Sequence, residues 1–256
     1  MITPDNARSY ELHLEKLIQA HGRDVAMELV VGGQYHQIGI LETSALITLG
    51  LQPDDTVVDV GCGSGRLPAY LKSYLRGKYV GTDILAESIE FAREKCGRDD
   101  WHFIQNHQTT IPVPDGIADF VTFFSVFTHL LDEDIFRFLA EAKRVAKPGG
   151  RIVFSFLDFE CESHWSLFEQ TIADARPERV INKFVAKSSI RRWTRALALT
   201  EERIYDGADR WVQLVEPFTY SDGRRAGGGA PTSANPSLSC GTFPRSFLHS
   251  IHSTFA

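Results

Sequence analysis

A short glycine-rich stretch is the first feature of this sequence that could do chemistry. It reads Gly61-Cys62-Gly63-Ser64-Gly65 and directly follows the β-branched run at 56–60. A strand that runs into glycines and then into a helix presents backbone N–H groups and the positive end of a helix dipole at its C-terminal end. Glycine has no Cβ, so a ligand can approach the backbone closely there. The stretch therefore predicts a ligand site at the mouth of this strand.

Two acidic residues indicate which ligand fits. Asp59 lies at the end of the strand, and the spacing is G-x-G-x-G, not the G-x-G-x-x-G of dinucleotide-binding proteins. A pyrophosphate about 4 Å from Asp59 would be repelled by about 1 kcal/mol in water and by about 4 kcal/mol at an effective dielectric constant of about 20. Asp83 ends the next predicted strand, where a carboxylate reaches both hydroxyls of a ribose. A ligand with a ribose, an ammonium and no phosphate is expected, and S-adenosylmethionine meets these requirements.

The elements that must position these residues alternate along the chain. Apolar runs typical of buried strands lie at 56–60, 78–82, 101–104, 120–126 and 152–157. Stretches with helical spacing of apolar residues separate most of them. Pro148-Gly149-Gly150 is expected to turn the chain into the last of these strands. Parallel neighbours need helical crossovers, so the alternation predicts a parallel sheet covered by helices on both faces.

The motifs together resemble those of class I S-adenosylmethionine-dependent methyltransferases. The resemblance covers residues 56–157 and weakens toward 215. It rests on the glycine motif with Asp59, on Asp83, and on the stretches I-P-V-P-D-G-I-A-D-F, S-V-F-T-H-L and K-P-G-G in family order. It implies an α/β Rossmann-like three-layer sandwich, with a mostly parallel sheet of seven strands and an antiparallel strand at one edge.

The resemblance also implies which residues contact the cofactor. These are Asp59, Gly61, Cys62 and Gly63 at the methionine portion, Asp83 at the ribose, Ile84 at the adenine, and Ser125 beside the transferred methyl group. The acidic residue that usually meets the adenine amino group is absent, so Asn106 or His107 must take its place. The implied activity is in-line transfer of a methyl group to an oxygen or nitrogen acceptor.

Three residues are candidates for removing a proton from the acceptor. In order of preference they are His129, Asp158 and His164. Two of them also have a structural interpretation: His129 could cap the following helix, and Asp158 could be a turn residue. His164 and Trp165 could line a pocket. Trp165, beside His164, belongs to an apolar stripe that is more typical of a core.

The remaining segments surround this predicted domain. Residues 1–50 read as an N-terminal helical cap, 51–215 as the cofactor-binding domain, and 158–187 as an inserted segment that helps to define the acceptor pocket. Within that domain, 202–205 and 211–215 resemble a strand pair. Residues 216–256 are rich in Ser, Gly and Pro and are expected to be a loosely ordered tail.

Composition and charge narrow the expected partners. The net charge of -6 disfavours loose nucleic-acid binding, so a small-molecule acceptor is expected. The cysteines form no C-x-x-C pair, which argues against a metal site and against a disulfide framework. No apolar run approaches the ~18 residues that span a bilayer. We expect a cytoplasmic protein without membrane or nucleic-acid partners, and whether it forms a homodimer stays open.

Two other functions stay open as well. A nicotinamide-dependent oxidoreductase shares the strand, glycine turn and helix, although the glycine spacing and Asp59 disfavour it. A non-catalytic S-adenosylmethionine-binding protein would carry the same cofactor motifs, and only turnover would distinguish it from an enzyme.

Overall fold

The computed structural model describes residues 4–174, 180–201, 204 and 213–219. Three helices, α1 (Pro4–His21), α2 (Arg23–Leu29) and α3 (Tyr35–Thr48), precede the first strand. The elements that follow are β1 (Val57–Val60), α4 (Arg66–Leu71), β2 (Tyr79–Asp83), α5 (Ala86–Cys96), β3 (His102–Gln105), β4 (Ala118–Phe123), the 3-10 helix η1 (Phe127–His129), α6 (Asp132–Val145), β5 (Ala146–Phe156), α7 (Glu162–Ala173), α8 (Lys187–Ala196), β6 (Thr200–Glu201) and β7 (Gln213–Thr219).

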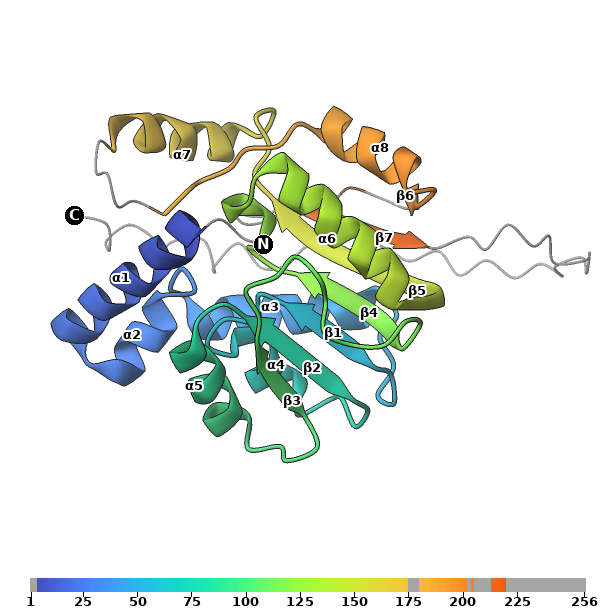
Figure 1. The fold of residues 1–256 in the computed structure, drawn as a ribbon, viewed down its shortest axis with the longest axis horizontal. Helices are drawn as coiled ribbons and strands as arrows, with labels where there is room; N and C mark the ends of the chain where they lie inside the picture. Colours follow the sequence, from blue (N-terminus) through green and yellow to red (C-terminus); the bar gives the residue numbers. More distant parts are fainter. Residues whose placement is uncertain (1–3, 175–179, 202–203, 205–212, 220–256) are drawn as a thin grey trace, which may run out of the picture. The chain divides into compact units, whose positions relative to one another are not determined.

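The strands form one sheet in the order β3-β2-β1-β4-β5-β7-β6 (Figure 1). Neighbours among β1 to β5 are parallel, whereas β7 is antiparallel to both β5 and β6. The expected α/β sandwich with a mostly parallel sheet is therefore confirmed. The antiparallel strand lies second from the edge and not at the edge itself, because the short β6 pairs with its outer side.

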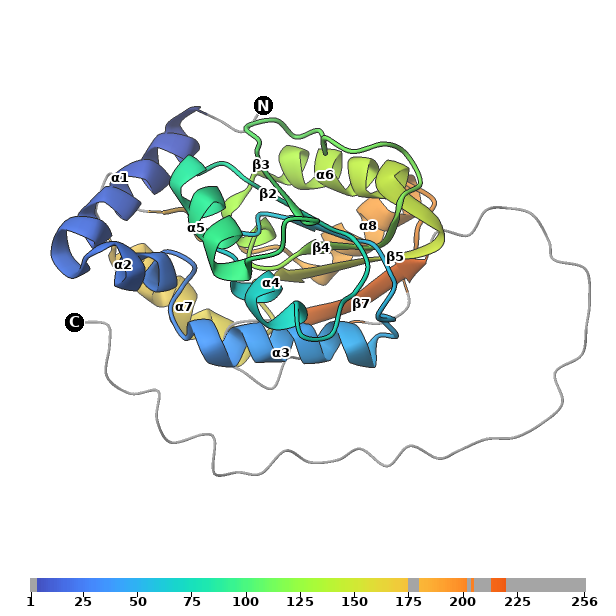
Figure 2. The same cartoon turned by 90° about the horizontal axis from the view of Figure 1, so that it is seen from below.

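Each face of the sheet buries its own apolar cluster. Val58, Val60 and Phe123 point to the face covered by α6 and α8, whereas Val57, Tyr79 and Val153 point to the face covered by α3, α4 and α5. Figure 2 shows α3 and α6 on opposite sides of the sheet. Successive side chains of a strand point to opposite faces, and both faces are covered, so these strands are apolar at almost every position.

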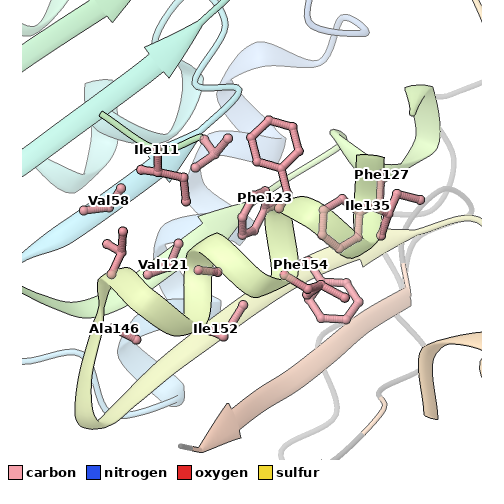
Figure 3. Packing of buried hydrophobic residues seen from close by; sticks show 14 of the residues in the cluster. Val58, Ile111, Val121, Phe123, Phe127, Ile135, Ala146, Ile152 and Phe154 are labelled. Atoms are coloured by element: carbon pink, nitrogen blue, oxygen red, sulfur yellow. The ribbon is translucent and has the colours of Figure 1, made fainter. Parts of the chain in front are cut away.

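Aromatic rings dominate the α6 side of the core. Phe127 lies between Phe123 and Phe154, with ring centroids 5.0 Å and 4.8 Å away, and Ile135 of α6 packs onto the same cluster (Figure 3). This packing holds η1 against the ends of β4 and β5. It therefore determines where His129, the last residue of η1, can lie.

The predicted element boundaries were wrong in three places. β4 ends at Phe123 and not at residue 126, because Ser125 adopts a left-handed φ of 59° that a strand cannot contain. The expected turn Pro148-Gly149-Gly150 lies inside β5, which pairs with Ala118 and takes up the extra residues at a register shift. β7 continues to Thr219, past the expected boundary at 215.

Several other predictions concern residues outside this description. The expected strand pair at 202–205 and 211–215 is described only at 204 and from 213, and the tail beyond 219 is not described. The N-terminal helices belong to the same compact unit as the sheet. Among the described residues no helix is long and apolar enough to cross a membrane, and no cluster of side chains could hold a metal ion.

Candidate functional site

The predicted site residues gather where the parallel strands end. The glycine turn follows β1, Asp83 ends β2, Ser125 follows β4 and Asp158 follows β5. Helices α1 and α2 lie beside this edge of the sheet in both views (Figures 1 and 2). Open parallel α/β sheets bind ligands outside the carboxyl ends of their strands. The topology therefore assembles the expected site from segments far apart in the sequence.

The glycine turn needs glycine for two reasons. Gly61, Gly63 and Gly65 have φ values of 75°, 54° and 86°, in the left-handed region that side chains rarely adopt. A Cβ at Gly61 would overlap the side chain of Val126, and one at Gly63 would overlap Val31. From the sequence, this space beside the glycines was expected to hold a ligand. In the structure, protein side chains occupy the space next to both glycines.

Asp59 lies inside the sheet. Its carboxylate is 2% exposed and accepts hydrogen bonds from the Tyr79 hydroxyl on β2 at 2.6 Å and from the Thr122 hydroxyl on β4 at 2.7 Å. Burial raises its pKa to about 6, although both hydrogen bonds act in the opposite direction. From the sequence, this carboxylate was expected to face the ligand. The structure instead makes Asp59 a bridge between three strands, directly beneath the glycine turn.

Asp83 connects the glycine turn to the start of α5. Its Oδ2 accepts a hydrogen bond from the Gly63 N–H at 2.9 Å, and its Oδ1 accepts one from the Leu85 N–H, also at 2.9 Å. Burial raises the pKa of this half-buried carboxyl, and the backbone donors lower it. The next residue, Ile84, packs at the side of a cluster that α1 and α2 build with Leu85. Carboxylate, glycine turn and apolar side chain thus lie together, as the resemblance implies.

The thiol of Cys62 points away from this edge. It is 6% exposed within the core cluster under α4 and α5, and burial raises its pKa well above the usual value. A thiol in such surroundings is not ionised and is a poor nucleophile. Only the backbone of Cys62 is placed to contact a ligand.

The loop after β3 carries the two candidates for the adenine contact. The Asn106 side chain donates to the carbonyl groups of Gln108 and Thr110 and accepts from the Gln108 N–H, so its amide stabilises its own loop. His107 lies 3.0 Å from the amide nitrogen of Gln105, which also donates to the Ile84 carbonyl. The loop therefore adjoins Ile84, and His107 is the better placed of the two.

Ser125 forms a strained turn between β4 and η1. Its N–H donates to the Ser155 hydroxyl at 2.7 Å, and its carbonyl accepts from the Thr128 hydroxyl at 2.9 Å. These bonds hold a left-handed conformation that is costly for a residue with a Cβ. Such conformations concentrate at binding sites, which agrees with the position of Ser125 between the cofactor motif and His129.

A buried ion pair was not found by sequence reasoning. Arg66, the first residue of α4, is 7% exposed and pairs with Glu42 of α3, which is 5% exposed. The same guanidinium donates to the Val31 carbonyl at 2.5 Å. The pair ties the segment before β1 to the glycine turn. Arg66 directly follows the glycine motif in the sequence, but nothing in the sequence indicates that Glu42 is its partner.

His129 is oriented by a backbone carbonyl. Its Nδ1 lies 2.6 Å from the Ile181 oxygen, and because a carbonyl can only accept, Nδ1 carries the proton and Nε2 is the basic nitrogen. Burial lowers its pKa to about 4, so the imidazole is neutral at pH 7. The Tyr10 ring of α1 lies edge-on to it, with centroids 5.5 Å apart. The inserted segment and α1 thus both reach the candidate base.

Asp158 and His164 form the turn that leads from β5 to α7. The Asp158 N–H donates to His164 Nδ1 at 2.9 Å, which occupies a lone pair that a proton acceptor would need. The Asp158 carboxylate is fully buried, with Oδ2 3.1 Å from the Lys187 ammonium. These contacts indicate that Asp158 is a turn residue and that His164 helps to hold the same turn. Trp165 was expected in the core but is 43% exposed, since α7 packs through its other face.

Comparison with known proteins identifies the central part of the chain. Residues 58–154 match the family model described as "Methyltransferase domain". These residues form a methyltransferase domain. The match includes the glycine turn, Asp83 and Ser125, and it confirms the expected resemblance to S-adenosylmethionine-dependent methyltransferases. A nicotinamide-dependent oxidoreductase is correspondingly disfavoured.

Relatives of this methyltransferase domain differ in what they act on. The chain is 29% identical over 167 residues to a fatty-acid O-methyltransferase of Mycolicibacterium smegmatis, covering 63% of this chain and 59% of that protein. It is 33% identical over 146 residues to a ribosomal protein L11 methyltransferase of Geobacter metallireducens, covering 55% of this chain and 46% of that protein. The matches thus span about half the length of these relatives.

The fold is shared with solved structures. The magnesium protoporphyrin IX methyltransferase of Synechocystis, solved with bound SAH, superposes with a TM-score of 0.62 over 84% of this chain and 96% of that chain, at 16% identity. A methyltransferase of Aquifex aeolicus gives a TM-score of 0.54 over 69% and 88%, at 22% identity. At these identities the likeness concerns the fold alone.

Proposed function

We propose that this protein transfers the methyl group of S-adenosylmethionine to an oxygen or nitrogen atom of a small molecule. One observation carries the proposal. Inside a methyltransferase domain, the carboxylate that ends β2 is hydrogen-bonded to the glycine turn that follows β1. A carboxylate, backbone N–H groups and an apolar side chain at one edge match the ribose, methionine and adenine of this cofactor.

The residues present fit the cofactor in distinct roles. Asp83 keeps lone pairs for the ribose hydroxyls beyond the two bonds it accepts from Gly63 and Leu85. Ile84 offers an apolar surface for adenine, and His107 a polar group near it. Ser125 holds the turn at the methionine end. Asp59 acts as a positioning residue, because its buried carboxylate holds β1 between β2 and β4.

In this reaction the protein has two tasks: to position the acceptor and to remove its proton. The sulfonium of the cofactor supplies an electrophilic methyl group, and in-line positioning of an acceptor can contribute about 7–11 kcal/mol. His129 is the proposed proton acceptor, through Nε2, with its ring oriented by the Ile181 carbonyl. A pKa of about 4 makes His129 a weak base, so it can assist only as the acceptor hydroxyl or amine loses its proton during transfer; a carboxylic acid is already ionised at pH 7 and needs no base.

Aromatic side chains of the inserted segment support an apolar acceptor. Phe159, Phe168 and Phe184 contact one another with centroids 5.2–5.3 Å apart, and the Trp165 ring is tilted against Phe168 at 5.2 Å. Phe159 and Trp165 are each 43% exposed. This aromatic cluster is built from the loop after β5, from α7 and from the segment around 184, and the nearby Ile181 carbonyl orients His129. The apolar surface agrees with the fatty-acid substrate that one relative's name states.

Transfer of a labelled methyl group tests this proposal. The protein is incubated with S-adenosylmethionine carrying a labelled methyl group and, separately, with medium-chain fatty acids, simple phenols and purified ribosomal protein L11. We expect label in a small acid or phenol. With a phenol, which must lose its proton during transfer, His129→Gln should lose about 10²-fold in kcat with unchanged affinity for S-adenosylhomocysteine. Labelled L11 alone would overturn the small-molecule acceptor, and binding without any transfer would indicate a non-catalytic protein.

A further inference from the structure

The hydroxyl of Tyr10 is buried without a hydrogen-bond partner among the described residues. Tyr10 lies in α1, and its ring packs at the side of the cluster formed by α1, α2 and Leu85. Ile84 packs at the side of the same cluster, so this cluster links Tyr10 to the two residues that follow Asp83. Burial of an unpaired hydroxyl costs free energy, and groups of this kind are rare unless something else completes them.

Two further observations place Tyr10 near the site. The Tyr10 ring lies edge-on to His129, with centroids 5.5 Å apart. The negative charge of Asp83 adds to burial in raising the pKa of Tyr10. Tyr10 thus lies near both the carboxylate assigned to the ribose and the proposed base.

We propose that Tyr10 binds the cofactor, with its hydroxyl donating a hydrogen bond to a ribose hydroxyl that Asp83 accepts from. A ribose hydroxyl is both a donor and an acceptor, so it can satisfy a carboxylate on one side and a phenol on the other. This inference rests on the proposed function, because it takes Asp83 as the ribose residue. It adds that α1 closes the nucleoside half of the site and brings that half into contact with His129.

A structural role for Tyr10 would give a different pattern of effects. If the hydroxyl served the fold, its removal would destabilise the free protein. If it serves the cofactor, its removal relieves an unpaired buried group in the free protein and weakens binding. Loss of the hydroxyl thus lowers the stability of the free protein in the first case, and keeps or raises it in the second. Tyr74 provides the matched control, because its hydroxyl donates to the Leu51 carbonyl at 2.7 Å, on another face of the molecule.

The experiment measures binding and unfolding of the full chain for Tyr10→Phe and Tyr74→Phe. Calorimetry uses S-adenosylhomocysteine and 5′-methylthioadenosine, which lacks the amino-acid end. For Tyr10→Phe we expect Kd to rise about 3- to 10-fold for both ligands, with an equal or higher Tm without ligand. For Tyr74→Phe we expect a lower Tm and an unchanged Kd. An unchanged Kd for Tyr10→Phe, a loss with S-adenosylhomocysteine alone, or a lower Tm would overturn the proposal.

Asp83→Ala in the same titrations separates this proposal from the function on which it rests. If Asp83→Ala binds both ligands like the unmodified protein, the cofactor site does not lie here, and both proposals fail. If Asp83→Ala loses affinity while Tyr10→Phe does not, only the role of Tyr10 fails. Unfolding curves of Asp83→Ala show whether any loss of affinity comes from a loss of structure.

Discussion

The buried carboxylate of Asp59 allows a quantitative prediction about stability and pH. Its pKa is raised from 3.8 to about 6 in the folded protein. Each pKa unit corresponds to about 1.4 kcal/mol, so at pH 7 ionisation of Asp59 costs the folded state about 3 kcal/mol relative to the unfolded chain. The folded state binds this proton more tightly. Protonated Asp59 therefore stabilises the folded state fully below about pH 4, and this contribution to the unfolding free energy is lost as the pH rises through about 6.

Replacement of Asp59 by Asn removes this titration and keeps the shape. The amide can still accept from one hydroxyl, Tyr79 or Thr122, and can donate to the other. The difference in unfolding free energy, Asp59→Asn minus unmodified protein, should increase by about 2 kcal/mol between about pH 4.5 and pH 7.5. Other titrating groups cancel in this difference.

Urea unfolding followed by tryptophan fluorescence, repeated from pH 4.5 to pH 7.5, measures this difference in unfolding free energy. Asp99→Asn is the control for the loss of a carboxylate, because Asp99 is exposed and lies outside the sheet. A difference for Asp59→Asn that stays constant from pH 4.5 to 7.5 would refute the reasoning. It would mean that the two hydroxyl donors compensate fully for burial and that the carboxylate ionises as readily inside the sheet as in water.

Two further predictions concern the glycine turn and the ion pair behind it. Gly61→Ala should destabilise the protein by about 2–5 kcal/mol in thermal unfolding, because it adds backbone strain and its Cβ overlaps Val126. Gly97→Ala is the control: its φ is also left-handed, at 58°, but the space around it is open, so it should cost about 1 kcal/mol. Glu42→Gln should cost about 3–5 kcal/mol by leaving Arg66 without its carboxylate, and the double variant Glu42→Leu/Arg66→Met should regain most of this. A double variant no more stable than Glu42→Gln would contradict the second prediction.

Local sequence patterns were sufficient for much of the fold. The apolar runs at 56–60 and 78–82 became β1 and β2, because a strand buried on both faces is apolar at nearly every position. The glycine turn was predictable because its left-handed conformation is a property of single residues.

Local patterns failed where pairing between distant segments decided the outcome. Pro148, Gly149 and Gly150 are turn formers, yet they lie within β5, because Ala146 before them pairs with Ala118 and Arg151 after them pairs with Phe120. Trp165 follows an apolar stripe, yet it is exposed because the inserted segment supplies other aromatic partners to α7. Propensity is weak compared with the free energy of such tertiary contacts.

The sequence alone determined the order of strands and helices, the glycine turn, and the spacing that puts Asp83 at the end of β2. These depend on residues close together in the chain. Only the tertiary structure decided that Asp59 faces Tyr79 and Thr122, that Arg66 pairs with Glu42, and that the Tyr10 hydroxyl is buried beside Asp83. Burial and hydrogen bonding, which set the ionisation of these groups, depend on neighbours that the chain brings together from more than one element.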